Sequence, residues 1–191
     1  MDSHLDNRNS AHREDVIGKQ CSIRVCKLFS PRIALVCLVA LGVILLDQVS
    51  KRAVLTNFYP GEVRQVIGGV FNLTLSFNPG AAFGLWSKLG EGWRELVLGG
   101  TTLLALGVVG YLLTRPNYRS YRAQAALAGI LGGAIGNVID RLKYGAVVDF
   151  LDLYLGSYHW PAFNVADSAI CIGVGVLLLV GVGEERLNLL T

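Results

Sequence analysis

The sequence predicts an all-α integral membrane protein: a four-transmembrane-helix bundle that carries a small extracytoplasmic β-hairpin platform. Two observations lead to this fold class. Of the 191 residues, 52% are hydrophobic and 16% are charged, whereas soluble domains carry about 25% charged residues. The apolar residues also gather into long runs separated by polar segments, a pattern that favours membrane spans. The net charge of +3 is small and scattered, so we expect no nucleic-acid partner.

Four apolar runs are long enough, or nearly long enough, to cross a bilayer. The expected spans are about residues 32–54, 95–114, 123–140 and 166–183. The first begins after Pro31 and continues past Asp47. At 1.5 Å per residue its length is ~34 Å, which is enough to cross the bilayer. The last two runs are slightly short, so the acids beside them are expected at or just inside the membrane interface.

Basic residues predict the orientation of these spans. No acid lies between residues 16 and 32, where several lysines and arginines precede the first span, and the loop 115–122 contains three arginines and no acid. Short basic segments of this kind stay in the cytoplasm. We therefore expect cytoplasmic tails at 1–31 and 184–191, flanking a membrane domain over 32–183. The extracytoplasmic segments are then 55–94 and 141–165.

The first extracytoplasmic segment has the pattern of a β-hairpin. Val63–Ile67 and Val70–Phe77 flank the dipeptide Gly68-Gly69, and apolar residues alternate with polar or small ones in the second run. A Gly-Gly turn between two such runs is typical of a hairpin. Because two strands alone are marginally stable, we expect this hairpin to rest on the helices or on the membrane surface.

Three acids converge on the outer face in this topology. Asp47 lies near the outer end of the first span, Asp140 ends the third span and Asp167 begins the fourth. Four glycines of the third span, at 129, 132, 133 and 136, share one helical face. Small residues at that spacing let another helix approach closely in lipid. Asp140 is one turn further along this face, so its side chain is expected to point into the bundle.

A carboxyl pair would give these acids a chemical function. Two close carboxyl groups cannot both ionise easily, so the pair holds one proton near neutral pH. The ionised member can take a proton from water, and the protonated member can polarise a peptide carbonyl. Structural roles are also open: Asp167 as a helix N-cap, Asp140 as an ion-pair partner of Arg141, and Asp47 as the i,i+4 partner of Lys51.

Five short blocks resemble those of the lipoprotein signal peptidase family and occur in the same order. They are D-Q-V-S-K at 47–51, N-P-G-A-A-F at 78–83, G-G-A-I-G-N-V-I-D-R at 132–141, V-V-D-F at 147–150 and F-N-V-A-D-S at 163–168. Together they extend over the chain from about residue 32 to 183. The first 30 residues lie outside the resemblance.

The resemblance implies a membrane aspartic endopeptidase, that is, a signal peptidase II. Such an enzyme removes signal peptides from diacylglyceryl-modified prolipoproteins by cleaving just before the lipidated cysteine. The implied catalytic residues are Asp140 and Asp167, without a metal or a cofactor. Supporting or substrate-binding roles are implied for Asp47, Lys51, Asn78, Gly80, Asn137, Arg141 and Asn164. The expected partners are the lipidated precursor and membrane lipid, and the enzyme is expected as a monomer in the bacterial inner membrane with its active site on the periplasmic side.

Two other classes of function are compatible with membrane acids and a glycine-rich helix face. A proton-coupled transporter would use the acids as a relay, but it should carry an acid near the middle of a span. A non-enzymatic assembly factor would use the glycine face alone. Substitution of Asp140 and Asp167 separates these classes from a protease.

Overall fold

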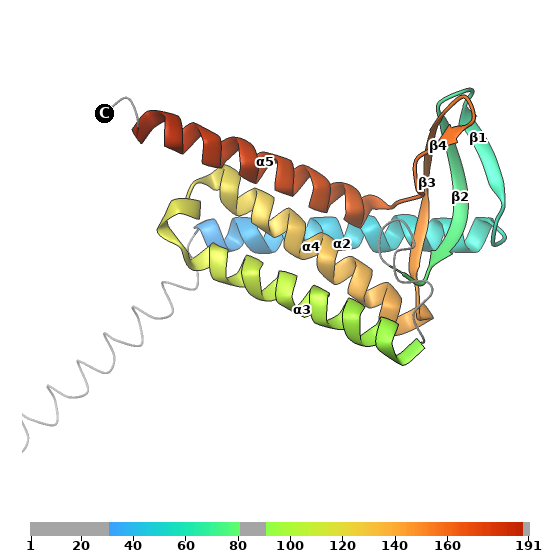
Figure 1. Cartoon of the computed structure of the whole chain (residues 1–191), viewed down its shortest axis with the longest axis horizontal. Coiled ribbons are helices and arrows are strands. Elements are labelled where there is room, and N and C mark those ends of the chain that lie inside the picture. The colour runs from blue at the N-terminus through green and yellow to red at the C-terminus, as the bar shows by residue number, and fades with distance from the viewer. Residues whose placement is uncertain (1–30, 81–90, 189–191) are drawn as a thin grey trace, which may run out of the picture. The chain divides into compact units, whose positions relative to one another are not determined.

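A computed structural model of the chain describes residues 31–80 and 91–188 (Figure 1). The predicted N-terminal tail up to residue 30, residues 81–83 of the second sequence block and residues 189–191 lie outside the described residues. The chain divides into two compact units after Leu35. The described part of the first unit, 31–35, is the beginning of a helix, and the second unit contains all the features analysed below.

Apolar helices account for most of the described residues. They are α2 (Pro31–Asn57), α3 (Glu91–Thr114), α4 (Tyr121–Tyr144) and α5 (Val165–Asn188), with a short 3₁₀ helix, η2 (Pro116–Tyr118), between α3 and α4. Within the described ranges, α2, α4 and the Leu96–Thr114 part of α3 are long and apolar enough to cross a membrane. The apolar part of α5, Val165–Val180, is shorter.

The glycine face of α4 packs against two different helices. A Cβ atom added to Gly133 would lie 2.5 Å from the backbone oxygen of Ala166 in α5, and one added to Gly136 would lie 2.6 Å from Oδ2 of Asp47 in α2. Gly132 is equally close to the backbone of α2. Only a residue without a side chain permits such approaches. The prediction of close helix packing on this face is therefore confirmed, and the packing brings α2 and α5 to α4 where the acids lie.

Four antiparallel strands form one small sheet at the end of the bundle where α4 ends and α5 begins (Figure 1). In spatial order they are β1 (Val63–Ile67), β2 (Phe71–Asn78), β3 (Val147–Leu155) and β4 (Tyr158–His159). The predicted hairpin is present as β1 and β2, and Gly69 in its turn has a φ of +81°. Glycine adopts this left-handed conformation at no steric cost.

Strand β3 corrects the sequence analysis, which predicted no strand in the extracytoplasmic segment 141–165 and left the hairpin without a third strand. β3 pairs with β2 along its length, from Phe71 opposite Leu153 to Asn78 opposite Val147. The β3 sequence is apolar on both faces except at two aspartates, so it lacks the simple alternation that marks a strand.

The sheet rests on the last turns of α2. Val54 of α2 packs with Leu75 of β2 and with Val148 and Phe150 of β3, and all four are buried. Because side chains alternate between the faces of a strand, packing Val148 and Phe150 onto this core directs Asp149 to the opposite face. The sheet thereby brings a carboxyl group from β3 towards α4 and α5.

Candidate active site

A buried ammonium group joins α2 to α4. Lys51 is 1% exposed, and its Nζ lies 2.8 Å from Oδ2 of Asp47 and 2.6 Å from Oδ2 of Asp140. It also donates a hydrogen bond of 3.1 Å to Oδ1 of Asn137. An ammonium group has three donors, so these three contacts use all of them. This pairing offsets the large cost of burying charge.

Both carboxylate oxygens of Asp140 accept hydrogen bonds. Its Oδ1 accepts a hydrogen bond of 2.9 Å from Nε2 of Gln48, and its Oδ2 accepts one of 3.1 Å from the backbone N–H of Val148 in addition to its contact with Lys51. The residue is 1% exposed. Its ion-pair partner is therefore Lys51 rather than the neighbouring arginine that the sequence had suggested.

Two asparagine amides connect this cluster to the beginning of α5. Because Lys51 can only donate, the Asn137 atom that faces it is the amide oxygen. The Asn137 Nδ2 then points to Asp167 and donates to its Oδ1 at 2.8 Å. Asn164 caps α5: its Oδ1 accepts from the backbone N–H of Asp167 at 2.9 Å, and its Nδ2 donates to Oδ1 of Asp149 at 2.8 Å.

The structure decides between the roles that the sequence left open for Asp167 and Asp47. Asn164, and not Asp167, is the side chain that caps α5. Asp47 forms the expected i,i+4 pair with Lys51, but its Oδ1 also accepts a hydrogen bond of 2.9 Å from the backbone N–H of Ala166. This places a carboxylate at the positive end of the α5 dipole, which is a stabilising arrangement.

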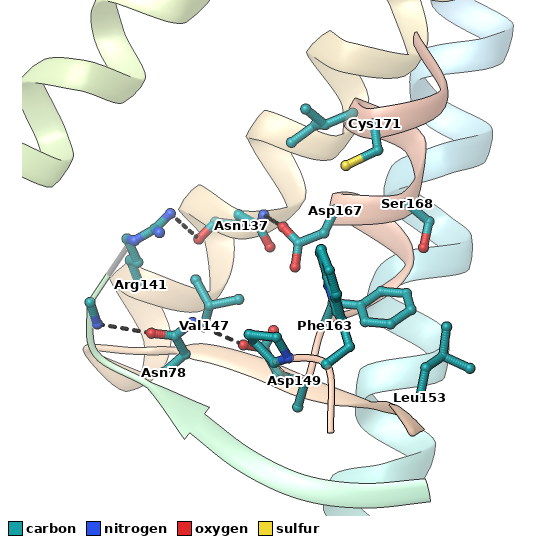
Figure 2. A pocket seen from close by; sticks show the side chains of 15 residues that line it. Asn78, Asn137, Arg141, Val147, Asp149, Leu153, Phe163, Asp167, Ser168 and Cys171 are labelled. Atoms are coloured by element: carbon teal, nitrogen blue, oxygen red, sulfur yellow. Dashed lines mark hydrogen bonds between the residues drawn. The ribbon is translucent and has the colours of Figure 1, made fainter. Parts of the chain in front are cut away.

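Asp149 and Asp167 face one cavity of about 440 Å³ (Figure 2). Asp149 comes from β3 and Asp167 from the first turn of α5, and Asn78, Asn137 and Arg141 line the same cavity. The remaining described lining is mostly apolar and includes Val147, Leu153, Trp160, Phe163, Ile170 and Cys171. The cavity therefore combines two carboxyl groups with an apolar wall that continues along α5.

The electrostatics of this cavity favour a shared proton. Burial, together with the negative charge of Asp167, raises the pKa of Asp149 to about 7. Hydrogen bonds to the carboxylate act in the opposite direction: Asn78 donates to Oδ2 at 3.1 Å and Asn164 donates to Oδ1. The Asp149 carboxyl group thus changes its protonation state near neutral pH.

Asp140 does not lie where the sequence analysis expected it. It is absent from the described lining of the cavity that contains Asp167, and it lines a different cavity of about 420 Å³ beside Lys51 and Gln48. The physical reason is that its side chain turns towards α2, where Lys51 and Gln48 engage its two oxygens. The carboxyl group that faces the cavity with Asp167 is that of Asp149.

Comparison with known proteins identifies the family. The family model described as signal peptidase (SPase) II matches residues 39–182. The chain belongs to the signal peptidase II family. It is 51% identical over 141 residues to the lipoprotein signal peptidase of Ralstonia nicotianae, covering 73% of this chain and 80% of that protein. The corresponding protein of Syntrophus aciditrophicus is 43% identical over 144 residues, covering 75% of this chain and 89% of that one.

A solved structure has the same fold. It is described as a bacterial membrane enzyme determined by the in meso method at 2.3 Å resolution, and it matches with a TM-score of 0.71 at 31% identity, covering 80% of this chain and 90% of that chain. The signal peptidase II family processes prolipoproteins and belongs to the aspartic class of peptidases, so this chain is a prolipoprotein-processing aspartic peptidase. Family membership decides against the transporter and the assembly factor.

The sequence analysis assigned no role to Asp149, although it lies in the V-V-D-F block at 147–150. One signal was available: an acid between Val148 and Phe150 interrupts an otherwise apolar segment of the second extracytoplasmic region. A strand assignment there would have directed this acid away from its apolar neighbours. The nine residues that were predicted lie in the Lys51 cluster or line the cavity of Figure 2, except Asn164, which donates hydrogen bonds to Asn137 and Asp149.

Lys51→Met is expected to destabilise the protein by about 3–5 kcal/mol, because it leaves the buried carboxylates of Asp47 and Asp140 without their cation. Adding Asp140→Asn should recover part of this loss by removing one of the unpaired charges. Thermal unfolding in detergent measures both effects. Arg52→Met is the matched control, since it removes an exposed cation from the next position of α2. Equal stability of the two single variants would contradict the role of Lys51.

Proposed function

We propose that this chain cleaves diacylglyceryl-modified prolipoproteins just before the lipidated cysteine, with Asp149 and Asp167 as the catalytic carboxyl pair. The observation that carries this assignment is the division of the buried acids into two pairs. Asp47 and Asp140 are both in contact with the ammonium group of Lys51. Asp149 and Asp167 face an open cavity, where the side-chain amides of Asn78, Asn137 and Asn164 donate hydrogen bonds to their carboxyl oxygens.

The mechanism uses one proton shared by this pair. The ionised carboxylate takes a proton from a water molecule, which attacks the scissile carbonyl carbon. The protonated carboxyl group donates to the carbonyl oxygen as the tetrahedral intermediate forms, and a proton then passes to the leaving amine. The two groups titrate as a unit. Asn137 orients Asp167, while Asn78 and Asn164 orient Asp149.

The remaining cavity residues support this chemistry. The backbone N–H of Gly80 donates to Oδ1 of Asn78 at 3.0 Å, which leaves the Asn78 Nδ2 directed at Asp149. Arg141 lines the cavity and is anchored by a hydrogen bond of 3.5 Å from its Nη1 to the backbone oxygen of Asn137. Its remaining guanidinium donors are suited to bind backbone carbonyls of the precursor.

The proposal includes the membrane orientation predicted from the basic residues. Helices α2, α3, α4 and α5 are the four spans, both termini are cytoplasmic, and the sheet with the cavity lies on the periplasmic side of the bacterial inner membrane. Two features support this arrangement: the arginine-rich loop between α3 and α4, and the position of the cavity beside the sheet. We propose a monomer in contact with membrane lipid, because one chain supplies both carboxyl groups.

Cysteine labelling tests this orientation. In a variant whose native cysteines are replaced by serine, Ser157→Cys in the β3–β4 turn is expected to react with a membrane-impermeant maleimide in intact spheroplasts. Asn117→Cys in η2 should react only after permeabilisation. Both positions are exposed, so accessibility depends on the side of the membrane. The reverse labelling pattern would contradict the proposed orientation.

Asp149→Asn and Asp167→Asn are each expected to reduce cleavage by about 10²–10⁴-fold, the range for loss of general acid–base catalysis. Asp140→Asn should retain much more activity, because it keeps an oxygen for the Val148 N–H and leaves Lys51 paired with Asp47. Incubating each purified variant with a lipidated precursor and quantifying the released signal peptide measures the difference. A folded Asp140→Asn variant without activity, beside an active Asp149→Asn variant, would refute the assignment.

The rate of cleavage is expected to fall as the pH rises through about 7, because Asp149 then loses the proton that the pair must hold. Asn78→Ala removes a hydrogen bond that favours the ionised carboxylate, so the pKa of Asp149 rises and the alkaline limb of the pH–rate profile moves to higher pH. Asn72→Ala is the control, since Asn72 donates at 2.9 Å to Asp152, another β3 carboxyl group. Identical profiles for the two variants would argue against this role of Asn78.

A further inference from the structure

A third cavity, of about 510 Å³, lies between α3 and α4, and we name it the α3–α4 groove. Its lining includes Leu98, Gly99 and Leu106 of α3 with Val138 and Leu142 of α4. The volume falls within the ~300–1,000 Å³ typical of small-molecule sites. The mechanism described above assigns no role to this groove.

The α3–α4 groove adjoins the catalytic cavity along two shared walls. Arg141 lines both of them. The turn after β2 is also shared, because Pro79 lines the groove while its neighbours Asn78 and Gly80 line the catalytic cavity. A ligand that occupied both spaces would therefore pass beside the Arg141 guanidinium.

The chemistry of the α3–α4 groove suits a hydrocarbon chain. Arg141 is its only charged residue among the described lining, and the hydroxyl group of Thr102 already donates to the backbone oxygen of Leu98 at 2.7 Å. Leu103 and Leu142 at the groove are 71% and 83% exposed. Such exposure is costly in water and favourable against lipid tails. The groove is thus apolar, open at the side, and charged at the wall it shares with the catalytic cavity.

We infer that the α3–α4 groove binds an acyl chain of the substrate's diacylglyceryl group while the peptide occupies the catalytic cavity. This inference rests on the proposed function, since cleavage just before a lipidated cysteine places the scissile bond and the acyl chains on adjacent groups. The two parts of the substrate then require adjoining sites. Arg141 lies at the boundary, where its donors can bind an ester carbonyl of the glyceryl group.

The size of the groove favours an acyl chain over the signal-peptide helix. A helix with its side chains is about 10 Å in diameter. An extended hydrocarbon chain is much narrower, and it can lie between α3 and α4, which pack against each other beside the groove. The signal-peptide helix is then expected to lie against the apolar wall of the catalytic cavity, along α5.

Gly99 allows a direct test. It lines the groove, and a Cβ atom added there meets nothing within 4 Å. Gly99→Leu should therefore fill the groove without disturbing the packing of α3. Gly100 is the matched control: it occupies the next position of the same helix, it is equally open, and it is absent from the described groove lining.

The experiment compares two lipidated precursors that share one peptide and differ in acyl length, one dipalmitoyl and one dihexanoyl. Gly99→Leu is expected to raise KM for the long-chain precursor by about tenfold, the range for lost apolar contacts in a pocket, and to leave KM for the short-chain precursor unchanged. Gly100→Leu should match the wild-type chain on both precursors. Unfolding temperatures of both variants show that the fold is retained.

Three outcomes would overturn the inference in distinguishable ways. An equal loss on both precursors would mean that the groove serves the peptide or the fold. No loss on either would mean that bulk lipid alone occupies it. A wild-type chain that cleaved neither precursor would refute the proposed function itself, and with it this inference.

Discussion

The contact of the buried Lys51 ammonium group with Asp47, Asp140 and Asn137 is the interaction on which the rest of the site depends. It joins α2 to α4 and fixes which atom of the Asn137 amide faces the cluster. The other end of that amide then reaches Asp167. The second carboxylate oxygen of Asp47 holds the backbone at the beginning of α5. One cation therefore links three helices and orients one member of the proposed catalytic pair.

The same cluster explains how two of several buried acids can serve as the proposed catalytic pair. Asp47 and Asp140 both lie against the ammonium group of Lys51, whose positive charge offsets the cost of burying their carboxylates. Asp149 and Asp167 have amide donors instead, and the pKa of Asp149 is raised by burial and by the negative charge of Asp167. The acids assigned a structural role and those of the proposed catalytic pair thus differ in the groups that lie beside them, not in residue type.

Much of this arrangement could be predicted from the sequence because it is local. Apolar runs mark the helices, the Gly68-Gly69 turn marks the β1–β2 hairpin, and the family blocks mark the polar residues. The pairing of β3 with β2 could not be predicted in the same way, because it joins segments distant in the chain and β3 has apolar residues on both faces. Because β3 was not predicted, the sequence analysis could not place the Asp149 side chain.

The position of the Asp140 side chain shows a second limit of prediction from the sequence. The glycine face of α4 predicts that Asp140 points into the bundle, and it does so. This face, however, serves two partners, with Gly133 against α5 and Gly136 against α2. Helical periodicity resolves the face of a helix, but it cannot decide between two neighbours that share that face. The choice depends on Lys51 and Gln48, whose positions follow from the packing of α2.

The proposed catalytic pair, drawn from a strand and a helix, also suits the substrate. In lipid, a signal peptide must remain helical, because each backbone group needs a hydrogen-bond partner, and a helical backbone encloses the carbonyl that water must attack. At the end of the bundle the cavity is bounded by β3 and by the first turn of α5, where amide and guanidinium donors are available to an unwound peptide. In the proposed orientation, the polar donors and the two carboxyl groups meet the precursor at the depth where it can leave the helical conformation, while its acyl chain stays beside α3.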